Sequence, residues 1–339
     1  MAGNDSPPSR NRAVKPSLSF FGLALIVTVV SAPAQQAGED ISFKVDVRLV
    51  SVLANVKDAR GAPIPDLKVE DFSVLDGGEE VAIAVFERRT NRPLSVTLMI
   101  DTSLSTAKDL RFEREAARRF VNNLIGPDSQ PEDQVAILQF SDYVDLLSDF
   151  TRSPQRLQDA LNRTRPDSGT SMYDAVLLAS QILEHRSGRR VVVVITDGGD
   201  TTSRIPFTEA LEAAHDVDTV IYGIIVVPIQ SDAGRNVGGE NALKSLAGQT
   251  GGETFIQYGT ADLDQAFREI LRNLRTQYLI AYYPPPARTG RERFRRTEVR
   301  VNRPGATVLG RTGYFLPEEE TNRPVSVPAN ISVQPPNQP

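Results

Sequence analysis

The chain has 339 residues, of which 40% are hydrophobic, so it is long enough for one large domain with a smaller companion and can build a proper core. It has no cysteine and only two histidines, His185 and His215. This excludes disulfides, thiolate metal sites and cysteine nucleophiles, and leaves any bound metal to oxygen ligands. The formal net charge of −5 argues against a nucleic-acid partner, because an acidic protein gains nothing from a phosphate backbone.

Residues 1–34 have the pattern of an export signal. Three basic residues precede the almost wholly apolar stretch 18–30, and Ala32-Pro33-Ala34 has the small-x-small pattern of a signal peptidase site. The apolar stretch is shorter than the about 20 residues that a membrane-spanning helix needs. We therefore expect cleavage before Gln35, only a transient contact with the membrane, and an exported protein that is periplasmic or secreted.

The next segment, residues 40–93, has the pattern of short β-strands. Apolar and polar residues alternate over 42–56, as in a half-buried strand. Two further strands are expected at Phe72–Leu75 and Val81–Phe86, separated by the turn Asp76-Gly77-Gly78. Such strands between Gly, Pro and Asp turns predict part of a β-sandwich.

Residues 94–276 alternate between strand and helix patterns. Apolar runs with little alternation, as in strands buried on both faces, occur at 95–100, 135–140, 191–195 and 220–227. Helical patterns occur at 107–124, 153–163, 173–186, 207–215, 239–249 and 262–275. This alternation predicts an α/β fold with a doubly wound, mostly parallel sheet, and a ligand site beyond the carboxyl ends of the strands.

The β pattern returns in residues 277–316, with strands expected at Tyr278–Tyr283, 294–301 and Gly313–Phe315. Neither β segment has enough strands to bury a core alone. We therefore predict that 40–93 and 277–316 fold together as a β-sandwich-like domain, with the α/β domain inserted between them. The tail 317–339 is rich in proline and polar residues and is predicted to be disordered.

An arginine-rich stretch, 288–303, lies inside the second β segment. We interpret it as an edge strand whose charges prevent sheet-to-sheet aggregation. The alternative is a surface that binds acidic polysaccharide or lipid.

Three loops at the predicted carboxyl edge of the sheet carry oxygen-bearing side chains. Two follow directly on the strands 95–100 and 191–195, and the third precedes the helix 173–186, so all three can reach one point. Each motif alone is also a common turn or helix cap, but their joint occurrence at strand ends favours a metal site for Mg²⁺, or Mn²⁺ or Ca²⁺. The candidate ligands are Asp101, Ser103, Ser105, Thr170 and Asp197.

The same motifs resemble the metal-ion-dependent adhesion site of von Willebrand factor type A domains. The resemblance rests on Asp101-Thr102-Ser103-Leu104-Ser105, on Gly169-Thr170 followed by Tyr173-Asp174-Ala175, and on Thr196-Asp197-Gly198. It extends over about residues 94–276, and the flanks are similar to bacterial exported proteins that embed such a domain in β segments.

The resemblance implies that Ser103 and Ser105 bind the cation directly, that Asp101 and Asp197 act mainly through waters, and that Thr170 joins when a ligand is bound. Neutral hydroxyl ligands leave the ion electron-poor, and an electron-poor ion with an open position attracts an anionic oxygen. The expected partner is therefore a protein that presents an Asp or Glu side chain, and the expected function is metal-dependent protein binding of the cell-adhesion type.

Two other functions compete with this one. A Mg²⁺-dependent hydrolase or phosphatase with Asp101 as nucleophile would want a second acid two residues on, where this chain has Ser103, and a lysine near the phosphate, for which the nearest candidate, Lys108, falls on the following helix. A structural envelope protein with a vestigial site is the third possibility. We favour binding and expect no enzyme.

Four polar residues near these motifs are interpreted separately. Asp174 is expected to be a structural hydrogen-bonding residue, and no role follows from the sequence for Asp200. His185 and His215 are expected to be partly exposed helix residues without a catalytic part.

Overall fold

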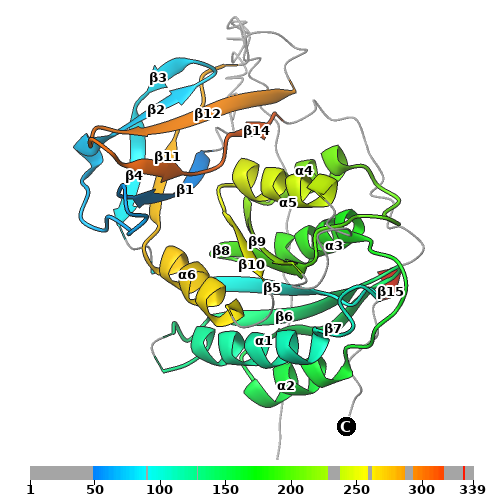
Figure 1. The fold of residues 1–339 in the computed structure, drawn as a ribbon. Coiled ribbons are helices and arrows are strands. Elements are labelled where there is room, and N and C mark those ends of the chain that lie inside the picture. The colour runs from blue at the N-terminus through cyan, green and yellow to red at the C-terminus, as the bar shows by residue number, and fades with distance from the viewer. Residues whose placement is uncertain are drawn as a thin grey trace, which may run out of the picture. The chain divides into compact units, whose positions relative to one another are not determined.

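The computed structural model describes residues 49–88, 91–127, 129–227, 237–258, 262–286, 293–316 and 331–332 (Figure 1). The predicted export signal and most of the predicted disordered tail lie outside these ranges. Within them, every helix is too short or too polar to span a bilayer.

A seven-stranded sheet forms the centre of the larger part of the chain. Its order is β10 (Thr254–Tyr258), β9 (Thr219–Val227), β8 (Arg189–Thr196), β5 (Leu94–Asp101), β6 (Gln134–Phe140), β7 (Val144–Thr151) and β15 (Ile331–Ser332). The strands from β10 to β6 are parallel, and β7 runs antiparallel to β6. The predicted α/β fold with a mostly parallel sheet is confirmed.

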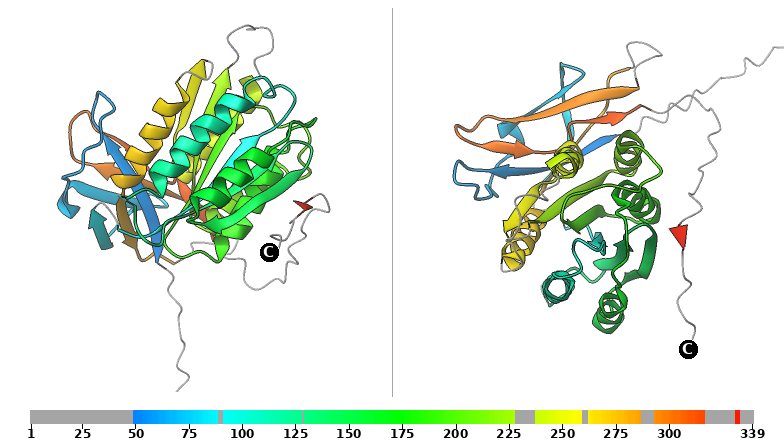
Figure 2. Two further views of the ribbon diagram at one scale, coloured as in Figure 1. Left: turned by 90° about the horizontal axis from the view of Figure 1, so that it is seen from below. Right: turned by 45° about the vertical axis from the view of Figure 1, so that its right-hand side comes forward.

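Helices cover both faces of this sheet (Figures 1 and 2). On one face lie α1 (Leu110–Leu124), α2 (Pro154–Arg163) and α6 (Leu263–Arg275). On the other lie α3 (Met172–Glu184), α4 (Phe207–Asp216) and α5 (Val237–Thr250). All six helices were predicted, with ends that differ from the structure by at most three residues. We call this part, residues 94–275, the α/β domain.

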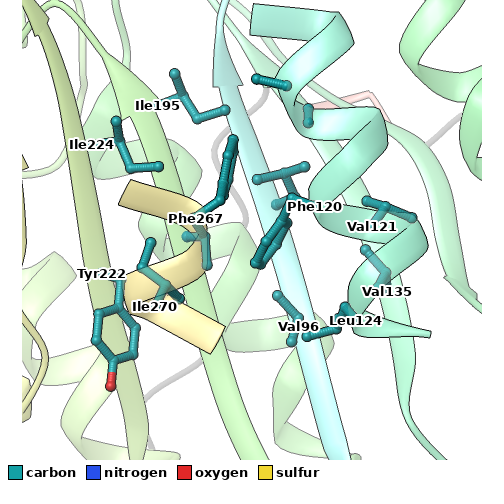
Figure 3. Packing of buried hydrophobic residues seen from close by; sticks show 14 of the residues in the cluster. Val96, Phe120, Val121, Leu124, Val135, Ile195, Tyr222, Ile224, Phe267 and Ile270 are labelled. Carbon is teal, nitrogen blue, oxygen red and sulfur yellow. The ribbon is translucent and has the colours of Figure 1, made fainter. Parts of the chain in front are cut away.

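The face below α1 and α6 is packed around two stacked aromatic rings (Figure 3). The ring centroids of Phe120 and Phe267 are 4.4 Å apart, and the rings rest among Val96, Ile195 and Tyr222 of the strands. Burying one such ring contributes roughly 1.5–3 kcal/mol. This packing fixes α1, the helix that follows the first candidate site loop, against the sheet.

The remaining described strands form two four-stranded sheets. One has the order β13 (Thr307–Leu309), β1 (Val50–Lys57), β11 (Tyr278–Tyr282), β4 (Ile83–Arg88), and the other β14 (Gly313–Phe315), β12 (Phe294–Val301), β2 (Phe72–Asp76), β3 (Glu79–Val81). Each sheet contains strands from both before and after the α/β domain in the sequence, and side chains of both sheets share one core. We call residues 49–88 and 278–316 the β domain.

The arginine-rich strand is not at an edge, so that part of the sequence interpretation is wrong. β12 pairs with β14 on one side and with β2 on the other. Arg295 points inward: its side chain is 2% exposed, and it donates to the carbonyl oxygens of Pro285 and Pro286 at 2.5 and 3.3 Å. Arg288 and Arg291 lie outside the described residues.

The β domain contacts the α/β domain through His215. This residue is only 4% exposed, so the prediction that it is partly exposed is wrong. Its ring makes edge contacts with Phe294 and Phe315 of the β domain. Arg311 donates to His215 Nδ1 at 3.2 Å and forms an ion pair with Asp218. Because an arginine can only donate, Nδ1 is the acceptor and the imidazole is neutral. His185, at the end of α3, is exposed as expected.

Candidate functional site

Asp101 lies at the carboxyl end of β5, beside the end of β8. The two strands are paired in parallel with Ile100 opposite Ile195, so Asp101 and Thr196 end their strands together. Thr196 Oγ1 donates to Asp101 Oδ2 at 2.6 Å, and the backbone N–H of Ser103 donates to Oδ1 at 2.8 Å. Each carboxylate oxygen is thus fixed, and the group is fully buried.

Ser103 and Ser105 lie side by side in the loop that follows. Their Oγ atoms are 2.9 Å apart, and Thr106 holds the turn because its Oγ1 donates to the carbonyl oxygens of Asp101 and Ser103, at 3.0 Å each. Two oxygens on adjacent corners of a Mg²⁺ octahedron, each 2.0–2.1 Å from the ion, are about 2.9 Å apart. The contact between the two hydroxyls is a hydrogen bond, and the same spacing would suit two ligands of one Mg²⁺.

The loop that carries Thr170 is joined by backbone hydrogen bonds to both neighbouring loops. Asp167 N donates to Thr102 O at 2.9 Å on the β5 side, and Thr201 N donates to Thr170 O at 2.8 Å on the β8 side. Ser103 and Asp167 also form a parallel β-bridge. The three loops predicted to converge are thus physically connected.

Gly169 makes this close approach possible. Its φ is +75°, and a Cβ there would lie 2.9 Å from Thr202 Oγ1 and 3.1 Å from Asp142 Cα. Any other residue would be strained and would push the loop away from its neighbours. Thr170 is 5% exposed at the position that results.

The acids near the end of β8 and in the first turn of α3 have separate tasks. Asp197 follows β8 directly and is half-buried. Asp200 Oδ2 accepts from Tyr173 N at 3.1 Å and from Ser203 Oγ at 2.5 Å, so it satisfies a free N–H group in the first turn of α3. Asp174 Oδ1 accepts from the backbone N–H groups of Arg204 and Ile205, at 3.0 and 3.2 Å. Its predicted structural role is confirmed, and Asp200 acquires one.

Burial dominates the electrostatics of the site. It raises the pKa of Asp101 to about 7, although hydrogen bonds from Thr196 and Ser103 act in the opposite direction. A second buried acid, Glu113 on α1, was missed by sequence reasoning. Burial, and then the negative charges of Asp101, Asp109 and Asp197, raise the pKa of Glu113 well above its usual value. The signal was present in the sequence: an acid occupies a core-facing position of an amphipathic helix.

The oxygen-bearing side chains at this edge are a mixture of neutral hydroxyls and carboxylates, which would suit a hard cation. Among the described residues, no group of three or more His, Cys, Asp or Glu side chains is arranged to hold a metal ion. A cation at this edge would therefore depend on hydroxyl oxygens together with carboxylates. Ser103 and Ser105 would supply the paired hydroxyls, while Asp101 and Asp197 would supply negative charge from the two strand ends.

Comparison with known proteins identifies the domain that carries this edge. Residues 96–199 match the sequence profile of the von Willebrand factor type A domain. No curated protein sequence matches the chain.

Several solved structures are similar in fold. The von Willebrand factor domain of the type V pilus tip protein Mfa5 from Porphyromonas gingivalis is 15% identical, with a TM-score of 0.46 over 55% of this chain and 96% of that one. BatB from Bacteroides thetaiotaomicron is 19% identical, with a TM-score of 0.43 over 54% and 100%. A von Willebrand factor type A protein from Catenulispora acidiphila is 14% identical, with a TM-score of 0.47 over 80% and 75%. The profile match alone spans all three site loops from β5 to Gly199, and this chain carries a von Willebrand factor type A domain.

Proposed function

We propose that this protein is an exported, metal-dependent protein-binding module. Asp101, Ser103, Ser105, Thr170 and Asp197 together hold one divalent cation, Mg²⁺ or else Mn²⁺ or Ca²⁺. The cation in turn binds an Asp or Glu side chain of a partner protein. The single observation that carries the proposal is the 2.9 Å separation of the Ser103 and Ser105 hydroxyl oxygens, next to a fixed carboxylate.

The chemistry of these ligands favours capture of an anion. Hydroxyl groups are neutral, so they leave most of the charge of a bound dication uncompensated. When the cation is bound, it supplies an electrophilic centre for one external oxygen. Asp101 is engaged by two hydrogen bonds that orient it, which suits a carboxylate that acts through water rather than by direct ligation.

Exposed apolar side chains beside the site favour a protein as the partner. Leu104, between the two serines, is 65% exposed, and Tyr143, in the turn between β6 and β7, is 52% exposed. The backbone of this turn is bonded to the Thr170 loop, because Asp142 N donates to Ser168 O at 2.7 Å. An apolar contact next to a metal–carboxylate bond is the kind of anchor that protein interfaces use.

Binding without turnover is part of the proposal. A phosphatase nucleophile at Asp101 would have to be accessible, whereas this carboxylate is fully buried and both its oxygens accept hydrogen bonds. Position 103, where such enzymes want a second acid, holds a hydroxyl.

Calorimetric titration of Mg²⁺ or Mn²⁺ into the mature protein tests the metal site. We expect one site per chain, and we expect Ser103→Ala combined with Asp197→Ala to lower the affinity on the order of 100-fold or more, since each group contributes roughly 10-fold or more. Ser180→Ala is the matched control, because this buried hydroxyl bonds only within α3, to Val176 O. Absence of binding, or binding that the double variant leaves unchanged, would favour a structural protein with a vestigial site.

Export has its own test. The mature protein, isolated from the envelope or the medium of the native cell, should begin at Gln35 when its N-terminus is sequenced. A protein that retains residues 1–34 would contradict the cleavage prediction and leave the metal site untouched.

A further inference from the structure

Helix α1 carries one charged residue in an otherwise apolar buried face. The buried side of the helix consists of Leu110, Glu113, Ala116, Ala117, Phe120, Val121 and Leu124. Glu113 is 0% exposed and occupies the turn of α1 nearest its N-terminus. An ionisable side chain is almost never fully buried unless it is paired.

Glu113 has no such pairing within the described part of the chain. Neither of its carboxylate oxygens has a hydrogen-bond partner there, and no described lysine or arginine forms an ion pair with it. The charged groups whose fields reach it are all acids: Asp101, Asp109 and Asp197. Two of these are the candidate metal-site carboxylates. Glu113 also lies one helical turn beyond the site loop, because its backbone N–H donates to Asp109 O at 3.0 Å and Asp109 N donates to Thr106 O at 2.9 Å, and Thr106 in turn donates to Ser103 O.

A buried and unpartnered carboxylate costs free energy in its charged form unless it takes up a proton or a group outside the protein compensates it. Its neighbours identify what that compensation is. The charges that act on Glu113 are all negative, which favours a cation nearby, and the hydrogen-bonded hydroxyls of Ser103 and Ser105 are 2.9 Å apart, a spacing that would suit two ligands of one Mg²⁺. Mg²⁺ keeps several of its waters in protein sites, and these waters need acceptors.

We propose that Glu113 is a sixth residue of the metal centre, in which its carboxylate accepts hydrogen bonds from water bound to the cation. This inference rests on the proposed function. Glu113 is thus a positioning residue: it holds the hydrated side of the ion on the side of the sheet covered by α1, while Ser103 and Ser105 hold the ion directly. Its negative charge also adds to those of Asp101 and Asp197, which strengthens retention of a dication over a monovalent ion.

The test compares Glu113→Gln with the wild type in the full mature chain. Glutamine keeps the volume and removes the charge. We expect Mg²⁺ and Mn²⁺ affinities to fall 10- to 100-fold, while the thermal midpoint of the metal-free protein stays the same or rises, because a neutral amide of the same size replaces an acid that burial makes costly to ionise. A merely structural residue would give the opposite pattern, with a lower midpoint and an affinity within twofold of the wild type, and that result would overturn the inference.

Two further variants sharpen the comparison. Glu115→Gln is the matched control on the same helix, since the Glu115 side chain is 42% exposed and pairs only with Arg111; it should leave metal affinity unchanged. Glu113→Asp keeps the charge and should retain more affinity than Glu113→Gln. Equal losses in both Glu113 variants would show that packing and not charge matters, which contradicts the inference.

The two proposals fail in different ways. If the wild type takes up neither Mg²⁺ nor Mn²⁺, the proposed function fails and Glu113 loses its role with it. If the wild type binds and Glu113→Gln binds equally well, only the role of Glu113 is refuted and the five-residue site stands.

Discussion

Replacing Gly239 by alanine is expected to lower the free energy of unfolding by about 3 kcal/mol and to weaken metal binding as well. Gly239, near the start of α5, lies against the loop that carries Asp197. A Cβ at this position would lie 1.4 Å from Gly198 O and 2.6 Å from Gly199 Cα. These are backbone atoms that cannot rotate away, so the helix or the loop has to move.

The same helix provides the control. A Cβ at Gly248 would have nothing within 4 Å, and Gly248 is exposed within α5. Gly248→Ala should therefore raise stability by about 0.5–1 kcal/mol. Urea unfolding and Mg²⁺ titration of both variants measure the effects. Similar results for the two alanines would show that the contact between α5 and the Asp197 loop does not position the site.

Acid is expected to destabilise the protein through His215. Burial, reinforced by the positive charge of Arg311, lowers the pKa of His215 to about 3 from its usual 6.5. Below pH 6.5 His215 is protonated in the unfolded chain but stays neutral in the folded chain, so the free energy of unfolding falls as the pH drops from 6.5 towards 3. The slope from this one group approaches about 1.4 kcal/mol per pH unit, for a total on the order of 5 kcal/mol.

Substitution isolates this contribution from that of the acids. In His215→Gln, the difference in unfolding free energy from the wild type should change with pH between 6.5 and 3, in favour of the variant as the pH falls. His185→Gln, at the exposed end of α3, should show a nearly constant difference over the same range. Denaturant unfolding at half-unit pH steps measures both. A flat difference for His215→Gln would contradict the assigned burial of the ring between the two domains.

The fold was predictable where the sequence pattern is local. Each helix has an apolar stripe, and the central strands are continuous apolar runs, so all were identified to within a few residues. β7 was missed because it is mostly half-buried and has neither an apolar run nor a clean alternation. The position of β12 inside its sheet was also missed. It depends on pairing with β2, and the whole α/β domain separates these two strands in the sequence.

In the candidate site, too, the features set by local sequence were predictable and those set by contacts between distant segments were not. Asp101 and Asp197 follow strand ends directly, so the sequence was sufficient to place them on one edge. The bonds that join the Thr170 loop to Thr102 and Thr201 depend on the positions of two other loops, which no local pattern encodes. Glu113 was missed because periodicity identifies the buried side of α1 but not the chemical group that faces that side.

The β domain is assembled from strands that are synthesised before and after the α/β domain, and this affects the order in which the chain can fold. The chain leaves the β domain at β4 and re-enters it at β11, and these two strands are direct partners, with Arg88 opposite Tyr278. β1 also pairs with β11, with Val50 opposite Tyr282, so its edge cannot be paired in this way before β11 has been synthesised. During synthesis the α/β domain can fold first, whereas the edges of β1 and β4 stay unpaired until the last fifth of the polypeptide emerges. A fragment cut before residue 277 would keep the three site loops but expose two ready templates for aggregation.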